Sequence, residues 1–155
     1  MRLHTASESI TFAKKLENDS ANFYEGLAQR YGKDTQTFLS FARENKKYIA
    51  QIERTYYEAI TDAIEGCFAF DIDPNDYTFK IMILEGVSYI EILNQAVQTE
   101  NTIMKFYMDI ANQSRGLMVD ISRVFAMVAR KREERSPKLR LLIENEVSRL
   151  GKCQT

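Results

Sequence analysis

The stretch LENDSANFYEGLA, residues 16–28, is the main evidence for the fold, because TENTIMKFYMDIA at 99–111 repeats its pattern. In each stretch a glutamate, Glu17 or Glu100, is followed six and seven residues later by a Phe-Tyr pair. The stretches are 83 residues apart, and the same offset relates further pairs: Thr5 and Ser88, Glu8 and Glu91, Ile10 and Leu93, Ala13 and Ala96, Ala28 and Ala111. The chain therefore contains an internal repeat, which must be recognised before a fold is assigned.

Apolar residues recur with helical period around both glutamates, so each carboxylate lies on a helix face predicted to be buried. The two stripes are Ile10, Ala13, Ala21, Tyr24, Leu27 and Ala28, and Leu93, Ala96, Ile103, Tyr107, Ile110 and Ala111. Burying an unpaired charge is costly, so each carboxylate needs a chemical partner.

Four long helices are predicted, over residues 5–31, 35–65, 88–113 and 119–135. The first begins at a capping box formed by Thr5 and Glu8 and ends before Gly32. Tyrosines at helical spacing are interpreted as amphipathic core residues whose hydroxyls bond to inner polar groups.

The chain after the fourth helix contains Ser136-Pro137, which either kinks a helix or restarts one with Ser136 as its N-cap. The segment 137–150 is therefore expected to continue the fourth helix or to bend away from it.

Residues 66–80, which include Pro74, form the one obvious linker. Its apolar residues are expected to pin it to the bundle: Phe68, Phe70, Ile72, Tyr77 and Phe79. Short loops within each half predict antiparallel hairpins, and the long middle connection allows the crossover of the ferritin-like four-helix bundle. We therefore predict one all-α domain over residues 1–155, with repeats at about 5–65 and 88–135 and a C-terminal helical extension.

The composition excludes several classes of function. With 21 basic and 22 acidic residues the net charge is −1, so nothing favours binding to nucleic acid or to an anionic membrane. No apolar run approaches the roughly 20 residues of a membrane span, and the N-terminus has no apolar signal core. Cys67 and Cys153 belong to no Cys-x-x-Cys pair, which predicts two free thiols in a reducing cytoplasm. A single histidine, His4, and the lack of glycine-rich phosphate motifs argue against nucleophilic catalysis and nucleotide binding.

Over residues 5–135 the chain resembles the rubrerythrin family of the ferritin-like superfamily. Three motifs carry the resemblance: Glu17-x5-Phe23-Tyr24, its duplicate Glu100-x5-Phe106-Tyr107, and the Phe38-x2-Phe41-Ala42 start of the second helix. The resemblance implies a di-iron site with one Glu from each of two helices and a Glu-x-x-His pair from each of the other two. The lone glutamates of that pattern correspond to Glu17 and Glu100.

The Glu-x-x-His positions depart from the family. The second and fourth helices align at an offset of 87 residues, which places these positions on Asn45-x-x-Tyr48 and Arg132-x-x-Arg135. Asn is a poor iron ligand and Arg offers no lone pair. His4, the only histidine, lies outside the helices. We interpret the di-iron site as degenerate.

Arg132 and Arg135 are hypothesised to neutralise Glu17 and Glu100, with Asn45 and Tyr48 supplying hydrogen bonds, because Arg presents a planar fork suited to carboxylates. Two alternatives remain: the glutamates lie exposed on a helix flank, or a metal site survives by recruiting other carboxylates. The candidates for recruitment are Glu44, Glu134 and Glu53. Glu44 and Glu134 are one residue off register, a rotation of about 100° around a helix, which makes recruitment awkward.

Three functions remain open. The first is a non-catalytic scaffold or interaction module without a cofactor, a homodimer through helix faces whose protein partner is unidentified. The second is an oxidoreductase that handles iron or peroxide, with Glu17 and Glu100 as metal ligands. The third is binding of a small apolar or anionic ligand in the vacated core, with Arg132 as charge partner.

Overall fold

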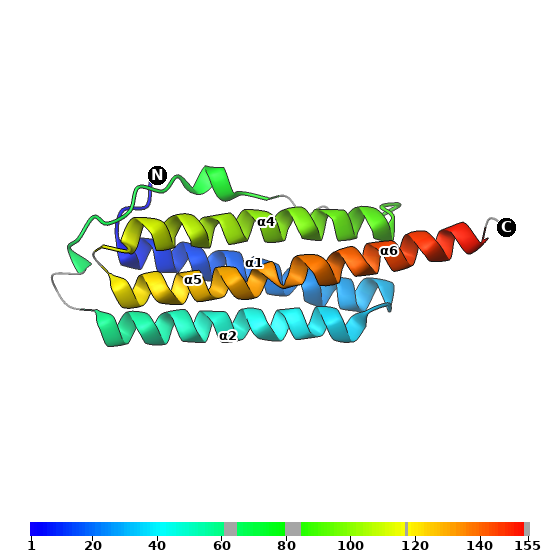
Figure 1. Cartoon of the computed structure of the whole chain (residues 1–155), viewed down its shortest axis with the longest axis horizontal. Helices are drawn as coiled ribbons and strands as arrows, with labels where there is room; N and C mark the ends of the chain where they lie inside the picture. Colours follow the sequence, from blue (N-terminus) through cyan, green and yellow to red (C-terminus); the bar gives the residue numbers. More distant parts are fainter. Residues whose placement is uncertain (61–64, 80–84, 117, 154–155) are drawn as a thin grey trace.

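The computed structural model describes residues 1–60, 65–79, 85–116 and 118–153. These contain the helices α1 (Ala6–Tyr31), α2 (Thr35–Ala59), α4 (Tyr89–Ser114), α5 (Val119–Glu133) and α6 (Arg135–Cys153), and the short 3-10 helix η1 (Pro74–Tyr77). The fold is all-α, with two hairpins, α1 with α2 and α4 with α5, joined by a long connection (Figure 1). None of the described helices is long and apolar enough to cross a membrane.

Local chemistry explains where the first helix of each repeat begins. The Thr5 hydroxyl accepts a hydrogen bond from the Glu8 amide at 3.2 Å, and a Glu8 carboxylate oxygen accepts one from the Thr5 amide at 3.1 Å. This capping box satisfies amide groups that have no partner within the helix. In the second repeat, Ser88 caps α4 by accepting from the Glu91 amide. α1 ends at Gly32, whose φ of 60° lies in the left-handed region that glycine adopts without strain.

Two helix boundaries differ from the prediction. α2 ends at Ala59, although the sequence pattern predicted a helix to about residue 65; residues 61–64 lie outside the described part. α5 ends at Glu133, and α6 begins at Arg135 without Ser136 acting as N-cap. Pro137 explains the break, since its ring clashes with the carbonyl four residues earlier, which belongs to Glu133.

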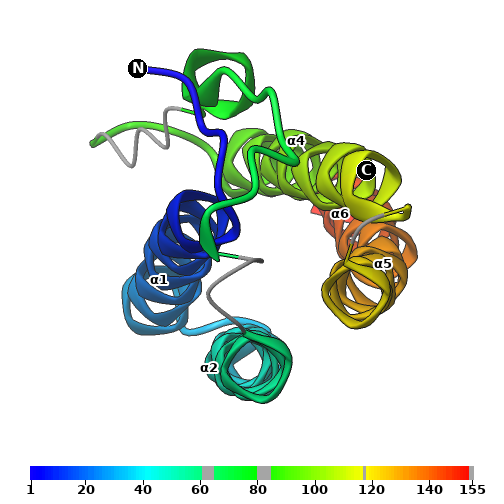
Figure 2. The same ribbon diagram turned by 90° about the vertical axis from the view of Figure 1, so that its left-hand side faces the viewer.

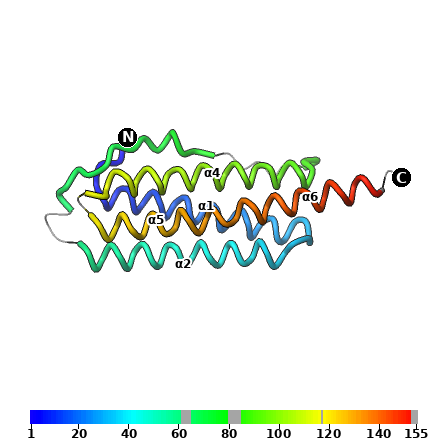
Figure 3. The backbone as a smooth tube through the Cα atoms, viewed as in Figure 1, coloured from blue at the N-terminus to red at the C-terminus, as the bar shows by residue number. Residues whose placement is uncertain are grey.

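The helices form a closed ring when the bundle is viewed along its axis (Figure 2): α1 lies beside α2, α2 beside α5, α5 beside α4, and α4 beside α1. α6 continues the course of α5, packs on α4, and projects beyond the ends of the other helices (Figures 1 and 3). α2 ends at one end of the bundle and α4 begins at the other, so the connection between them crosses the length of the bundle (Figure 1).

The connection is attached to the N-terminal segment as well as to the bundle. Leu3 and Ile72 exchange two backbone hydrogen bonds of 2.7 and 3.2 Å in an isolated antiparallel bridge. Phe70, Ile72 and Tyr77 are buried, as predicted. Phe68 was wrongly expected to pin the linker: it is 74% exposed and stacks on the ring of His4.

The buried apolar side chains form two separate clusters rather than one continuous core. One cluster contains Leu16, Tyr48 and Ile103, and the other contains Ala21 and Ala96. On α1 and α2, the residues between the two clusters, 17–20 and 43–47, are all polar. The candidate site therefore lies between the two apolar clusters, where buried polar residues separate them.

Candidate functional site

A layer of buried polar side chains separates the two apolar clusters. Each of four helices contributes one residue to it: Glu17 from α1, Asn45 from α2, Glu100 from α4 and Arg132 from α5. All four residues are at most 1% exposed. We call them, together with Arg135, the arginine–carboxylate layer.

Arg132 lies between the two carboxylates and bonds to both. Its Nε and Nη2 donate to the two oxygens of Glu17 at 2.9 and 2.8 Å, a bidentate arrangement. Its Nη1 donates to Glu100 Oε2 at 2.5 Å, and Nη2 also donates to Asn45 Oδ1 at 3.2 Å. Ionised partners and paired bonds make these the strongest class of protein hydrogen bond.

Arg135, the first residue of α6, closes the layer from the other side of Glu100. Its Nη1 donates to Glu100 Oε1 at 3.1 Å, and its Nη2 donates to the Phe41 carbonyl at 2.9 Å. Nη2 also lies 3.4 Å from a carboxylate oxygen of Glu44, whose side chain is 34% exposed at the edge of the layer. The guanidinium carbon lies 4.7 Å from the ring centre of Phe41 and 5.6 Å from those of Tyr24 and Tyr48, within the range of cation–π attraction.

Each tyrosine of the repeated motif donates a hydrogen bond to the glutamate of the other repeat. Tyr24, from the first repeat, donates to Glu100 of the second at 2.7 Å, and Tyr107 donates to Glu17 at 2.8 Å. The helical spacing of the tyrosines predicted that their hydroxyls bond to inner polar groups, but periodicity along one helix does not reveal that the contacts are reciprocal.

Asn45 is the only α2 residue in the layer. It donates to the hydroxyl of Ser20 at 3.0 Å while its oxygen accepts from Arg132. Ser20 was not singled out from the sequence; its position three residues after Glu17, on the same helix face, was the available signal.

The electrostatic environment fixes the charges of the layer. Burial raises the pKa of Glu100, but Arg132, Arg135 and the Tyr24 hydroxyl lower it by more, so the pKa lies below its ordinary value. Burial lowers the pKa of Arg132, but Glu100 and Glu17 raise it well above the ordinary value. Burial, reinforced by the neighbouring carboxylate, raises the pKa of Tyr24 far above its usual range. These three groups therefore keep one charge state around neutral pH.

The layer is electrically balanced, and this balance depends on an asymmetry between the repeats. The first helices are symmetric, since Glu17 and Glu100 occupy equivalent positions. The second helices are not, since one carries two arginines where the other carries Asn45 and Tyr48. If both second helices carried Asn and Tyr at these positions, two negative charges in the buried layer would be uncompensated. If both carried two arginines, the layer would contain two extra positive charges. Either arrangement is costly.

Burial also raises the pKa of Tyr48, to about 12. Its hydroxyl donates to Glu44 at 3.1 Å, so it bonds at the rim of the layer rather than to Glu17 or Glu100.

The off-register carboxylates do not join the layer as a metal cluster. Glu44 bonds to Arg135 and Tyr48, and Glu53 forms an ion pair of 2.5 Å with Lys14. Glu134 is exposed in the turn between α5 and α6. Within the described ranges, no group of three or more His, Cys, Asp or Glu residues could hold a metal ion.

Chemically, the layer is a nearly saturated ion-pair network. Every charged atom that the structure describes in it has a partner except the buried Nε of Arg135. His4, the only histidine, stacks on Phe68 and lies 3.2 Å from the Phe70 carbonyl, away from the layer.

Comparison with known proteins found no match to a family model, to a curated protein or to a solved structure.

Proposed function

We propose that this chain is a rubrerythrin-like, ferritin-like scaffold or interaction module without catalytic activity, in which arginine has taken the place of a di-iron centre. The observation that carries the proposal is the single guanidinium of Arg132 bonded to both Glu17 and Glu100. In the family pattern those two glutamates hold iron, and a cation at their centre neutralises them. Arg132 supplies a permanent cation at the same point.

The side chains of the layer do not fit a di-iron centre. Such a centre needs four carboxylates and two imidazoles. Only Glu17 and Glu100 match that set, and Asn45, Arg132 and Arg135 would have to be replaced or moved. A cationic guanidinium in contact with both carboxylates also repels a metal cation from them. The oxidoreductase alternative therefore lacks a set of donors, and no step of such chemistry follows from these residues.

The small-ligand alternative is not favoured either. Four surface cavities are lined by side chains other than those of Glu17, Glu100 and Arg132. Arg132 and Arg135 are 0% and 1% exposed and occupy the midpoint of the bundle.

Elemental analysis of iron tests the proposal. The wild-type protein is incubated with ferrous iron without oxygen and then desalted. A matched variant restores both Glu-x-x-His pairs: Asn45→Glu, Tyr48→His, Arg132→Glu and Arg135→His. We expect no stoichiometric iron in the wild type and about two irons per chain in the restored variant.

Each outcome is decisive. Stoichiometric iron in the wild type would overturn the proposal in favour of an oxidoreductase. A restored variant that folds, as judged by circular dichroism, and still binds no iron would overturn the rubrerythrin-like relation. The predicted homodimer is part of the proposal and is tested by sedimentation equilibrium at several protein concentrations.

A further inference from the structure

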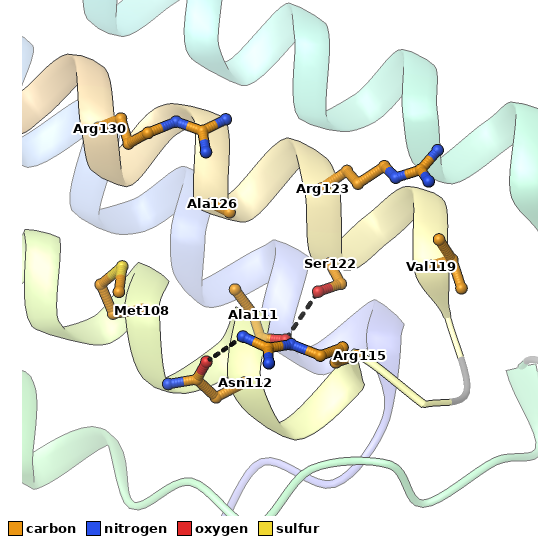
Figure 4. Close-up of a pocket in the computed structure, with 9 residues that line it drawn as sticks. All are labelled: Met108, Ala111, Asn112, Arg115, Val119, Ser122, Arg123, Ala126 and Arg130. Atoms are coloured by element: carbon orange, nitrogen blue, oxygen red, sulfur yellow. Dashed lines mark hydrogen bonds between the residues drawn. The ribbon is translucent and has the colours of Figure 1, made fainter.

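A groove on the surface between α4 and α5 is a second candidate site, separate from the arginine–carboxylate layer (Figure 4). It has a volume of about 490 Å³. Small residues line its floor and arginines line its rim: Ala111, Ser122 and Ala126, and Arg115, Arg123 and Arg130.

The floor is effectively apolar. Its one hydroxyl, on Ser122, already donates to the Ala111 carbonyl at 2.7 Å, as the dashed line in Figure 4 shows. Alanine and serine side chains are short, so the backbone of an approaching element can come close to both helices. The floor therefore favours an apolar face without large side chains opposing it.

Exposed apolar side chains extend the groove at its sides. Met108 on α4 is 43% exposed, and Val119 at the start of α5 is 50% exposed. Both line the groove. Together with the small residues of the floor, these two side chains give the groove an apolar lining.

Among the described residues, no rim arginine forms an ion pair, although Arg123 also lines a second cavity together with Glu58 and Asp120. Arg123 and Arg130 make no ion pair with any acidic residue in the described ranges, and Arg115 donates only to the neutral amide oxygen of Asn112, at 3.1 Å. The buried arginines of the layer, by contrast, are bonded to carboxylates. The rim therefore carries cationic forks available to carboxylates from outside.

We propose that the α4/α5 groove binds an acidic amphipathic helix of a partner protein. The inference deepens the proposed function, because it names the surface and the partner class of the interaction module. From Val119 to Arg130 the groove follows α5 for about 16 Å, the length of three helical turns. A helix of that length places apolar residues at i, i+3/i+4 and i+7 on the floor and acidic residues against the rim.

Charge complementarity distinguishes this occupant from a second copy of the chain. Two copies meeting through the same groove would oppose like-charged arginines, which is unfavourable. The projecting helix α6 of a second copy is also a poor match for the arginine rim, because its basic residues outnumber its acidic ones. It carries Lys138, Arg140, Arg149 and Lys152 but only Glu144 and Glu146 as acidic residues.

Fluorescence anisotropy of the full chain with labelled synthetic peptides tests the proposal. The probe is a helix of about 15 residues, stapled at i and i+4, with an apolar seam and glutamates beside it. The control peptides replace every glutamate by lysine or scramble the order. We expect the acidic peptide to bind in about 50 mM salt and to weaken in about 300 mM salt, since exposed charges are screened.

Two variants separate the contributions of the rim and the floor. Arg123→Glu with Arg130→Glu reverses the rim charge, and Ala126→Trp fills the floor while every arginine remains. Each is expected to weaken binding about tenfold or more, the size of a hot-spot or charge-pair loss. The matched control, Lys47→Glu with Arg54→Glu, reverses two exposed charges on α2 and is expected to change binding less than about twofold.

Equal binding of acidic and basic peptides, or wild-type binding by Ala126→Trp, would overturn the proposal. So would binding only to phosphatidylserine vesicles, which would indicate a lipid surface, or a self-association abolished by Ala126→Trp, which would indicate a second copy. Iron content and peptide binding are separate readouts, so this inference and the proposed function fail independently.

Discussion

Replacing Arg132 by methionine removes the cation that joins the two halves of the repeat. Methionine has a similar length and no charge, so the substitution introduces little empty space. Glu17 then loses both of its charge-assisted bonds and keeps only the Tyr107 hydroxyl. Glu100 loses one bond but keeps Arg135 and Tyr24.

The expected loss follows from this difference between the two carboxylates. Glu17 becomes a fully buried charge without a counterion, and breaking a buried pair in this way costs about 3–5 kcal/mol. Glu100 adds little, because Arg135 still neutralises it. Against a typical free energy of unfolding of about 5–15 kcal/mol, the loss is a large fraction.

Urea denaturation at pH 7, followed by circular dichroism, measures the loss. With a slope of roughly 2 kcal/mol per molar urea, the midpoint falls by about 2 M. The double variant Glu17→Gln with Arg132→Met removes the buried charge together with its partner. It is expected to recover at least half of the loss, because a neutral amide replaces the buried charge that has no counterion.

Lowering the pH provides an independent check. In Arg132→Met, protonation removes the buried charge that has lost its counterion, so the loss of stability shrinks as the pH falls. The difference in the free energy of unfolding between Arg132→Met and the wild type is therefore expected to decrease from pH 7 to about pH 5. A free energy of unfolding within about 1 kcal/mol of the wild-type value at pH 7 would show that Arg132 is not the counterion of Glu17, because a buried carboxylate without a counterion carries a larger penalty.

Three further predictions concern the packing of α6, the cap of α1 and the charge of Glu100. Leu139, on α6, is fully buried, so Leu139→Ala is expected to lower the free energy of unfolding in urea by about 2–5 kcal/mol. Leu141, on the same helix, is 55% exposed, so Leu141→Ala is expected to change that free energy by less than about 0.5 kcal/mol. Equal effects of the two substitutions would show that α6 does not pack as described. Thr5→Ala removes the cap of α1 and is expected to lower the free energy of unfolding by about 1 kcal/mol, which lowers the melting temperature. An unchanged melting temperature would contradict the capping box. The pKa of Glu100 is lowered in the folded protein, so its contribution to stability is present above about pH 4 and is lost as the pH falls through the folded-state pKa. In Glu100→Gln, the free energy of unfolding is therefore expected to fall less steeply on the acid side. A dependence on pH parallel to that of the wild type would exclude this role of Glu100.

Several features were predictable because they depend on residues close together in the chain. The caps at Thr5 and Ser88 and the stop at Gly32 are local, so sequence patterns locate them to within one or two residues. The apolar stripes place Glu17 and Glu100 on buried faces, and the repeat makes them equivalent. The all-α class follows from the same periodicity, and the two hairpins follow from the short loops within each half.

Other features depend on contacts between distant segments and were not predictable. Leu3 and Ile72 meet across 69 residues of chain, and no local pattern indicates that pairing. The exposure of Phe68 is similar, since hydrophobicity predicts burial on average but not which aromatic residue of a linker finds a neighbour.

The residues of the layer can be identified from the sequence: two equivalent glutamates, and two arginines at positions aligned with Asn45 and Tyr48. Their bonding depends on the packing of the helices: Arg132 bridges both carboxylates, Arg135 binds one, and each tyrosine bonds to the glutamate of the other repeat. Helix periodicity fixes only the direction in which a side chain points around the axis of its own helix. The order of the helices in the ring and their relative heights decide which of those side chains meet.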